Sequence, residues 1–188
     1  MSQADLLRLV VRSLEEAGIE YLVTGSIASS LQGEPRSTHD LDLVVAIREV
    51  HVPAVVAAFP RPRFYVDEGA VREAIRFSGM FNVIDTTEGD KADFWMMTDE
   101  PFDSSRFARR IRQRVLDLAF DVSSPEDTIL AKLRWSRMSG ESQKSFTDAL
   151  RVYEVQQDII DSAYLDEWAA TLGVADLLDR IRTEAEPA

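Results

Sequence analysis

The chain has 188 residues, of which 45% are hydrophobic and 29% charged, the composition of one ordinary globular domain or of a domain with a small extension. It contains no cysteine, which excludes disulfide scaffolds, thiolate metal sites and cysteine nucleophiles. The net charge of −12 argues against broad, sequence-independent binding of nucleic acid, because such binding needs a basic surface.

The N-terminal segment MSQADLLRLVVRSLEEAG predicts an amphipathic helix over residues 3–17 that ends at Gly18. It carries an early aspartate and no small-residue cleavage site, so we do not expect a secretory signal. No apolar run approaches the roughly 20 residues that span a bilayer. We therefore expect a cytoplasmic protein without a membrane partner.

Short apolar runs separated by turn-forming residues then predict strands and helices in alternation. We expect Gly25-Ser26 to be the turn after the first strand, and RPRF at 61–64 to be a loop. The expected strands are 21–24, 40–47, 80–86, 92–97 and 115–120, with 80–86 and 92–97 forming a hairpin, and the expected helices are 27–32, 49–59 and 66–79.

The segment Ser124-Pro125-Glu126-Asp127 predicts a helix start, because it places Ser at the N-cap, Pro at the first helical position and acids in the first turn. The pattern from there to about residue 183 is helical, with breaks near Gly140 and Gly173. The predicted fold class is α+β. A mixed β-sheet flanked by helices over residues 1–122 is followed by a C-terminal helical region over residues 123–188.

Two aspartates, Asp40 and Asp42, stand at the start of the apolar run LVVAI. Residues two apart on a strand face the same way, so their carboxylates share one face. Like charges at a partly buried site repel each other, which favours either protonation or a bound cation. Oxygen ligands without a nearby Cys or His ligand favour Mg²⁺ or Mn²⁺ over zinc.

A candidate phosphate cradle lies upstream at Gly25 and Ser26, between a predicted strand and a predicted helix. Free N–H groups and the helix dipole attract anions there, glycine allows close approach, and the serine hydroxyl adds a donor. A phosphate-binding turn followed by a carboxylate pair indicates phosphoryl or nucleotidyl transfer.

The stretch GSIASSLQGEPRSTHDLDLVV resembles the active-site signature of the nucleotidyltransferase superfamily with the DNA polymerase β-like fold. Its R-x-T-x-D-x-D form at residues 36–42 looks most like AbiEii-type and related minimal nucleotidyltransferases. FNVIDTTEGDKADFWMM is similar to the segment with a third carboxylate, here Asp93. SSPEDTILAKLRW and KSFTDALRVY resemble later helices that carry Lys132 and Asp148. The family's last motif often reads Lys-Asp-x-x-Asp, whereas here Lys144 precedes a serine.

The resemblance implies a catalytic core over residues 1–122 that moves NMP from an NTP onto an acceptor hydroxyl. Asp40, Asp42 and Asp93 would be catalytic and would hold Mg²⁺ (or Mn²⁺). The acceptor would be tRNA, a protein or a small molecule, and the protein could belong to a toxin–antitoxin pair with a cognate partner protein. The implied nucleotide-binding residues are Gly25, Ser26, Arg36, Thr38, Lys132 and Asp148.

Several alternatives stay open at this point. Asp85 or Asp90 could replace Asp93 as the third carboxylate. His39 alternates with Asp40 on the expected strand, so we expect its side chain on the opposite face. Five arginines between Arg106 and Arg114 form either a solvated surface segment, which we favour, or a small phosphate-facing patch. The alternative function is a non-catalytic module of the same fold that binds a partner protein or acts as an antitoxin-like subunit.

Overall fold

The computed structural model describes residues 2–38, 40–115 and 117–186. The chain divides into two compact units. The first comprises the residues up to Thr24 together with Thr38–Val122, and the second comprises Gly25–Ser37 together with the residues from Ser123 onward. The second unit therefore takes in segment 25–37, which the predicted boundary after residue 122 assigns to the core.

The described part of the first unit contains a seven-stranded mixed sheet in the order β3-β4-β5-β2-β1-β7-β6. Strands β2 and β5 pair in parallel, as do β1 and β7, and the other neighbouring strands are antiparallel. The strands are β1 (Tyr21–Thr24), β2 (Asp40–Val45), β3 (Phe64–Tyr65), β4 (Met80–Asp85), β5 (Lys91–Met96), β6 (Ile111–Val115) and β7 (Leu118–Val122).

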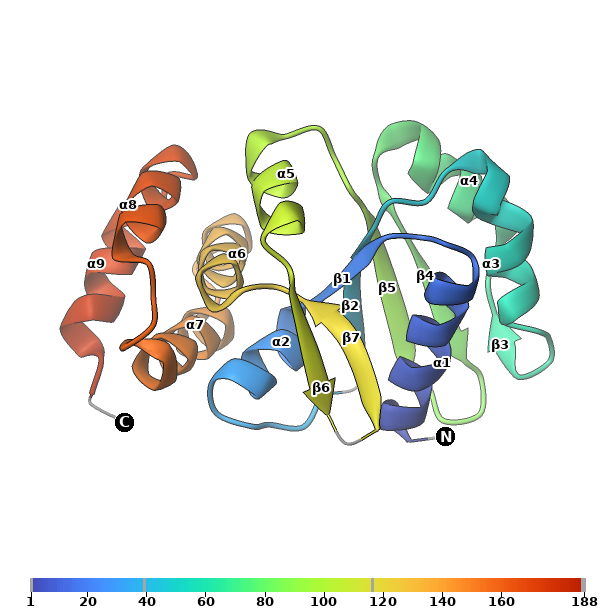
Figure 1. The fold of residues 1–188 in the computed structure, drawn as a ribbon, viewed down its shortest axis with the longest axis horizontal. Coiled ribbons are helices and arrows are strands. Elements are labelled where there is room, and N and C mark those ends of the chain that lie inside the picture. The colour runs from blue at the N-terminus through green and yellow to red at the C-terminus, as the bar shows by residue number, and fades with distance from the viewer. Residues whose placement is uncertain (1, 39, 116, 187–188) are drawn as a thin grey trace. The chain divides into compact units, whose positions relative to one another are not determined.

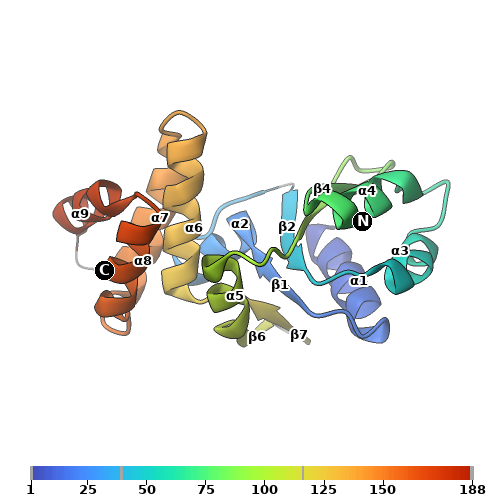
Figure 2. The same cartoon turned by 90° about the horizontal axis from the view of Figure 1, so that it is seen from above.

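Helices of the first unit flank this sheet (Figure 1). Both views show α3 and α4 next to each other, and α4 also contacts β4 (Figure 1, Figure 2). The helices are α1 (Gln3–Glu16), the 3₁₀ turn η1 (Glu49–His51), α3 (Val52–Ala58), α4 (Glu68–Phe77) and α5 (Pro101–Ala108).

The two faces of β2 carry different parts of the core. Leu41, Leu43 and Val45 are buried on one face. Phe94 of β5 lies in register with Leu43 and stacks on Phe81 with ring centroids 4.8 Å apart. Strands covered on both faces need apolar residues on both faces, so the residue types on the second face of β2 show whether that face is also covered.

The other face of β2 begins with Asp40 and Asp42 and becomes apolar only at Val44. Val44 packs with Leu22 of β1 and with Phe107 of α5 in one buried cluster. Asp40, two strand positions earlier than Asp42 on the same face, is exposed, and Asp42 is half-buried. The apolar run of β2 is therefore explained by burial beneath α5 at one end, and the acids lie at the other end.

Two elements of the first unit differ from the sequence prediction. The single strand expected at 115–120 is a hairpin in which Arg112 of β6 pairs with Asp121 of β7; residue 116 lies outside the described residues. Helix α5 was not predicted, because its eight residues bury only Phe102, Asp103 and Phe107 and show little helical periodicity. The predicted loop at 61–64 ends in the two-residue strand β3.

The second unit is helical, as predicted for the C-terminal region. Helix α6 packs against α7, and α8 against α9 (Figure 1, Figure 2). The chain breaks at Gly140 and Gly173 as expected and also between α7 and α8. The helices are α2 (Gly25–Gln32), α6 (Pro125–Met138), α7 (Gln143–Gln156), α8 (Ser162–Thr171) and α9 (Ala175–Glu184). Within the described residues, no helix combines the length and the apolar character needed to cross a membrane.

Helix α2 ends in close contact with α7. The buried side-chain amide of Gln32 donates to the backbone carbonyl of Ser123 at 2.6 Å, and the backbone carbonyl of Gln32 accepts from the Gln156 side chain at 2.7 Å. A Cβ atom added at Gly33 would lie 2.8 Å from the backbone nitrogen of Val152. Backbone atoms in a packed helix cannot yield easily, so this position requires glycine.

We expect Gly33→Ala to lower the free energy of unfolding by about 2 kcal/mol, because overpacking against a fixed backbone costs roughly 1–3 kcal/mol. Urea unfolding measures the loss. Gly79→Ala is the matched control, since the nearest atom to its added Cβ is 3.8 Å away, an ordinary contact. Equal losses in the two variants would show that the contact at Gly33 is not restrictive.

Candidate active site

The carboxylates predicted to be catalytic come from two neighbouring parallel strands of the first unit. Asp42 of β2 lies in register with Asp93 of β5, and Asp40 lies in register with Lys91. Residues in register on adjacent strands point to the same face, and residues two apart on one strand do so as well. Asp40, Asp42, Asp93 and Lys91 therefore share one face of the sheet.

Asp93 is buried and its two oxygens have different surroundings. Its Oδ2 accepts a hydrogen bond from Lys91 Nζ at 2.8 Å. Its Oδ1 is buried and has no hydrogen-bond partner within the part of the chain that the structure describes. A buried carboxylate oxygen without a partner is costly, so a functional ligand is the natural explanation for it.

Lys91 also reaches Asp40, with its Nζ 3.6 Å from Asp40 Oδ1. The hydrogen bond to Asp93 is the main cause that raises the pKa of Lys91, so this side chain stays protonated and positively charged. Sequence reasoning did not assign Lys91 a role. The available signal was its spacing of two residues from Asp93, which puts both side chains on one face of a strand.

The two alternatives for the third carboxylate belong to the same hairpin as Asp93. Asp85 is buried on the opposite face of β4, because Asn82 and Ile84 are the residues in register with Asp93 and Lys91. It accepts a hydrogen bond from the backbone of Thr87 at 2.9 Å and so stabilises the β4–β5 turn. Asp90 precedes β5, and its carbonyl accepts from the Asp85 amide at 2.8 Å. Asp93 is the acid that lies beside Asp42.

The donor set of this face suits a hard divalent cation. Among the described residues, no three acidic or histidine side chains already converge as a metal site. The first unit nevertheless places three carboxylates at one end of one sheet face, with the unpartnered Oδ1 of Asp93 among them. Carboxylate oxygens are the ligands that Mg²⁺ prefers, and the ammonium of Lys91 shows that a cation is accommodated there.

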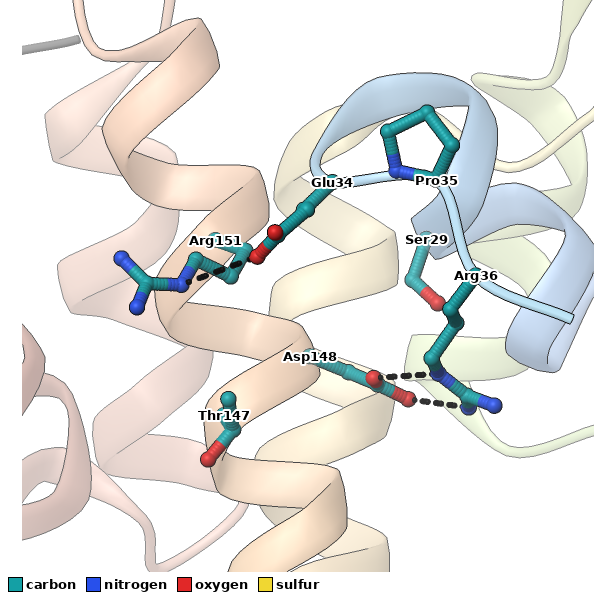
Figure 3. Close-up of a pocket in the computed structure, with 7 residues that line it drawn as sticks. All are labelled: Ser29, Glu34, Pro35, Arg36, Thr147, Asp148 and Arg151. Atoms are coloured by element: carbon teal, nitrogen blue, oxygen red, sulfur yellow. Dashed lines mark hydrogen bonds and ion pairs between the residues drawn. The ribbon is translucent and has the colours of Figure 1, made fainter.

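Four of the predicted nucleotide-binding residues form a hydrogen-bonded cluster within the second unit. Arg36 donates two hydrogen bonds to Asp148, from Nε at 2.9 Å and from one terminal nitrogen, Nη2, at 2.8 Å (Figure 3). The same terminal nitrogen donates to Ser26 Oγ at 2.7 Å. Lys132 of α6 donates to Asp148 at 2.6 Å. The cluster joins α2, α6, α7 and the loop after α2.

The charges of this cluster are coupled. Burial alone would raise the pKa of the Asp148 carboxyl, but hydrogen bonds from Arg36 and Lys132 outweigh burial and hold the pKa below its ordinary value. The hydrogen bond to Asp148 likewise raises the pKa of Arg36. Two cations share one carboxylate, which leaves a net positive charge in the cluster.

The cluster borders a pocket of the second unit with a volume of about 260 Å³. Figure 3 shows Arg36 and Asp148 turned toward each other, with Glu34 and Arg151 forming a second ion pair. The pocket is lined by Ser29, Glu34, Pro35, Arg36, Thr147, Asp148 and Arg151.

Gly25 is the first residue of α2, so the expected Gly25-Ser26 turn is the first part of the helix. Its φ of +63° lies in the left-handed region, where a side chain would be strained. The amide groups in the first turn of a helix lack helical partners and can bind an anion. Thr38 accepts a hydrogen bond from the Asp40 amide at 3.3 Å. The expected orientation of His39 lies outside the described residues.

The arginines between residues 106 and 114 are largely neutralised inside the first unit. Arg106 pairs with Asp103 at 2.9 Å. Arg110 and Arg112 both pair with Asp121, at 3.3 Å and 3.2 Å, and each has a second acidic partner. Paired charges attract a phosphate weakly, so the structure favours the solvated-surface interpretation over a phosphate-binding patch.

No protein-family model matches the chain, and no curated protein matches it. Solved structures of nucleotidyltransferases do resemble it. The solution structure of the antibiotic-resistance factor ANT(2″)-Ia is 12% identical with a TM-score of 0.58, covering 96% of this chain and 94% of that one. The crystal structure of ANT(2″)-Ia with adenylyl-2″-tobramycin is 12% identical with a TM-score of 0.61, covering 92% and 98%.

A third structure is that of an antigenic nucleotidyltransferase-like protein from Paracoccidioides brasiliensis, 16% identical with a TM-score of 0.55, covering 97% of this chain and 93% of that one. At such identities the likeness shows the fold alone. It confirms the predicted nucleotidyltransferase-like architecture. The narrower resemblance to AbiEii-type proteins stays a prediction.

Proposed function

Because the chain has the nucleotidyltransferase-like fold, we propose that it is a Mg²⁺-dependent nucleotidyltransferase that moves NMP from an NTP onto an acceptor hydroxyl. The observation that carries this proposal is the register of Asp42 beside Asp93, with Asp40 on the same face. A structural role does not require three carboxylates together, since like charges on neighbouring strands destabilise a sheet.

Asp40, Asp42 and Asp93 would hold Mg²⁺, or Mn²⁺ in its place. When bound, the metal would neutralise phosphate charge and make the α-phosphorus easier to attack. The acceptor oxygen forms a bond to the α-phosphorus while the bond to the bridging oxygen breaks, and pyrophosphate leaves. Asp93 would help to accept the hydroxyl proton, because its Oδ1 has no hydrogen-bond partner among the described residues.

We assign the residues of the second unit to nucleotide phosphates. The first turn of α2 at Gly25 and Ser26 offers the amide groups of a helix N-terminus, and Arg36 and Lys132 offer positive charge. Asp148 would hold both cations in place before the nucleotide binds. We also propose Thr38 of the first unit, two residues before Asp40, as a nucleotide-binding residue.

The acceptor class follows from charge. A net charge of −12 and the ion pairs of Arg106, Arg110 and Arg112 disfavour tRNA, because a polyanion requires unpaired positive surface. A hydroxyl on a small molecule or on a protein suits the acidic chain better. Of the similar structures, the ANT(2″)-Ia crystal structure holds an adenylylated small molecule, adenylyl-2″-tobramycin. A toxin–antitoxin role with a cognate partner protein would accompany a tRNA or protein acceptor.

The alternative is a non-catalytic module that keeps the fold and binds a partner protein. Such a module gains nothing from the mutual repulsion of Asp42 and Asp93 in register. Metal-dependent nucleotide binding separates the two hypotheses, since the catalytic protein should bind NTP in the presence of Mg²⁺ and the module should not.

Label transfer tests the proposed reaction. The purified protein is incubated with each α-labelled NTP and Mg²⁺ against total tRNA, a protein lysate and a small-molecule fraction. We expect label in the small-molecule or protein fraction, and none when the metal is chelated. Label in tRNA would correct the acceptor assignment. The absence of label from every fraction, together with no Mg²⁺-dependent NTP binding, would contradict the catalytic proposal.

A further inference from the structure

Lys91 places a positive charge among the carboxylates of the first unit. Its Nζ lies 2.8 Å from Asp93 Oδ2 and 3.6 Å from Asp40 Oδ1. The side chain is 39% exposed, whereas that of Asp93 is 9% exposed. The ammonium thus approaches a buried acid from the solvent side on a flexible stem, which can change rotamer without disturbing the sheet.

The ammonium contacts Asp93 Oδ2 and lies near Asp40 Oδ1, so it competes electrostatically with a metal bound to these carboxylates. A carboxylate that coordinates Mg²⁺ holds it at roughly 2.0–2.1 Å, and a second cation in hydrogen-bond contact with that carboxylate would be repelled. Three carboxylates without a counter-ion would also repel one another, so Lys91 stabilises the sheet when metal is absent.

We propose that Lys91 is an internal counter-ion that neutralises the carboxylate site in the metal-free protein and competes with a divalent cation for these carboxylates. Lys91 thereby lowers the metal affinity of the site, so a higher cation concentration is needed to occupy the site. This inference rests on the proposed function, because it assumes that Asp40, Asp42 and Asp93 are the metal ligands.

The test measures the affinity for Mn²⁺, used as the probe, from the electron paramagnetic resonance signal of the free ion. We expect Lys91→Met to bind Mn²⁺ about tenfold more tightly than the natural chain, since removing a competing charge near a partly exposed site is worth on the order of one decade in affinity. Lys91→Arg keeps the charge and should leave the affinity within about twofold.

Arg114→Met is the matched control for net charge. Arg114 is an exposed residue of β6, three strands away from β2 in the same sheet. It should leave Mn²⁺ affinity unchanged, which separates a local effect of Lys91 from a general change in charge. The rise in unfolding temperature on adding Mn²⁺ provides a second measurement, and it should be larger for Lys91→Met than for the natural chain.

The outcomes separate the two proposals. If the natural chain binds Mn²⁺, Asp42→Asn loses it and Lys91→Met leaves the affinity unchanged, the metal site stands and the role of Lys91 is wrong. If neither the natural chain nor Lys91→Met binds Mn²⁺, both the metal site and the counter-ion role are wrong. Should Lys91→Met fail to fold, Lys91→Gln removes the same charge and is measured in its place.

Discussion

Asp42→Asn is expected to abolish NMP transfer, with a loss of at least about 10³-fold in kcat/KM, because a removed group of an interdependent catalytic set typically costs that much or more. Asparagine keeps the shape of the side chain and removes its charge. Asp42 lies in register with Asp93, so the substitution deprives the face of one of two adjacent carboxylates. Label transfer with the natural chain and the variant in parallel measures the loss.

The same substitution should leave stability unchanged or slightly higher. Like charges in register on neighbouring strands repel each other, so the neutral amide removes this repulsion while it removes function. Asp99→Asn is the control, since Asp99 is an exposed acid that follows β5 in the chain. Full activity in Asp42→Asn, or a large drop in its unfolding temperature, would show that Asp42 serves the fold and not the reaction.

The sequence predicted the faces of the strands better than their partners. Alternation along β2 places Asp40 and Asp42 on one face without knowledge of any neighbour. The position of Asp93 beside Asp42 depends on the parallel pairing of β2 with β5, which lie about fifty residues apart in the chain. An apolar run marks a strand but does not identify the strand beside it, so the carboxylate pair across strands rested on resemblance alone.

The elements that could not be predicted from the sequence lack a periodic pattern of apolar residues. Strand β6 is exposed on both faces, so it has no alternation of apolar and polar residues, and its arginines indicated only a charged surface. One of the ion pairs that neutralise it, Arg112 with Glu15, joins residues 97 positions apart. Local pattern cannot show such pairs, and the same limit hid the contact of Lys91 with Asp40.

The cluster around Asp148 shows a related limit. Resemblance indicated Arg36, Lys132 and Asp148 as separate nucleotide-binding residues. The second unit brings them into mutual contact, with Arg36 and Asp148 112 residues apart in the sequence. Asp148 thus also has a structural role as the partner of the two cations, and the sequence did not indicate this role.

Asp148→Asn is therefore expected to destabilise the second unit by about 3 kcal/mol. It leaves the guanidinium of Arg36 and the ammonium of Lys132 beside a neutral amide, and breaking a buried ion pair from one side costs roughly 3–5 kcal/mol. The lower end applies because Arg36 is partly exposed and solvent screens it. Urea unfolding at pH 7 measures the difference, and Asp158→Asn, an exposed acid that follows α7, is the matched control.

The difference should depend on pH in a defined direction. The hydrogen bonds from Arg36 and Lys132 hold the pKa of Asp148 below its ordinary value despite burial, so the ionised carboxylate favours the folded state. This contribution is fully present above the unfolded-state pKa of about 3.9 and is lost as pH falls through the lower folded-state pKa. The natural chain and Asp148→Asn should therefore differ most at neutral pH and converge below about pH 4. A difference that stays constant down to pH 2 would show that the loss comes from packing and not from the charge of Asp148.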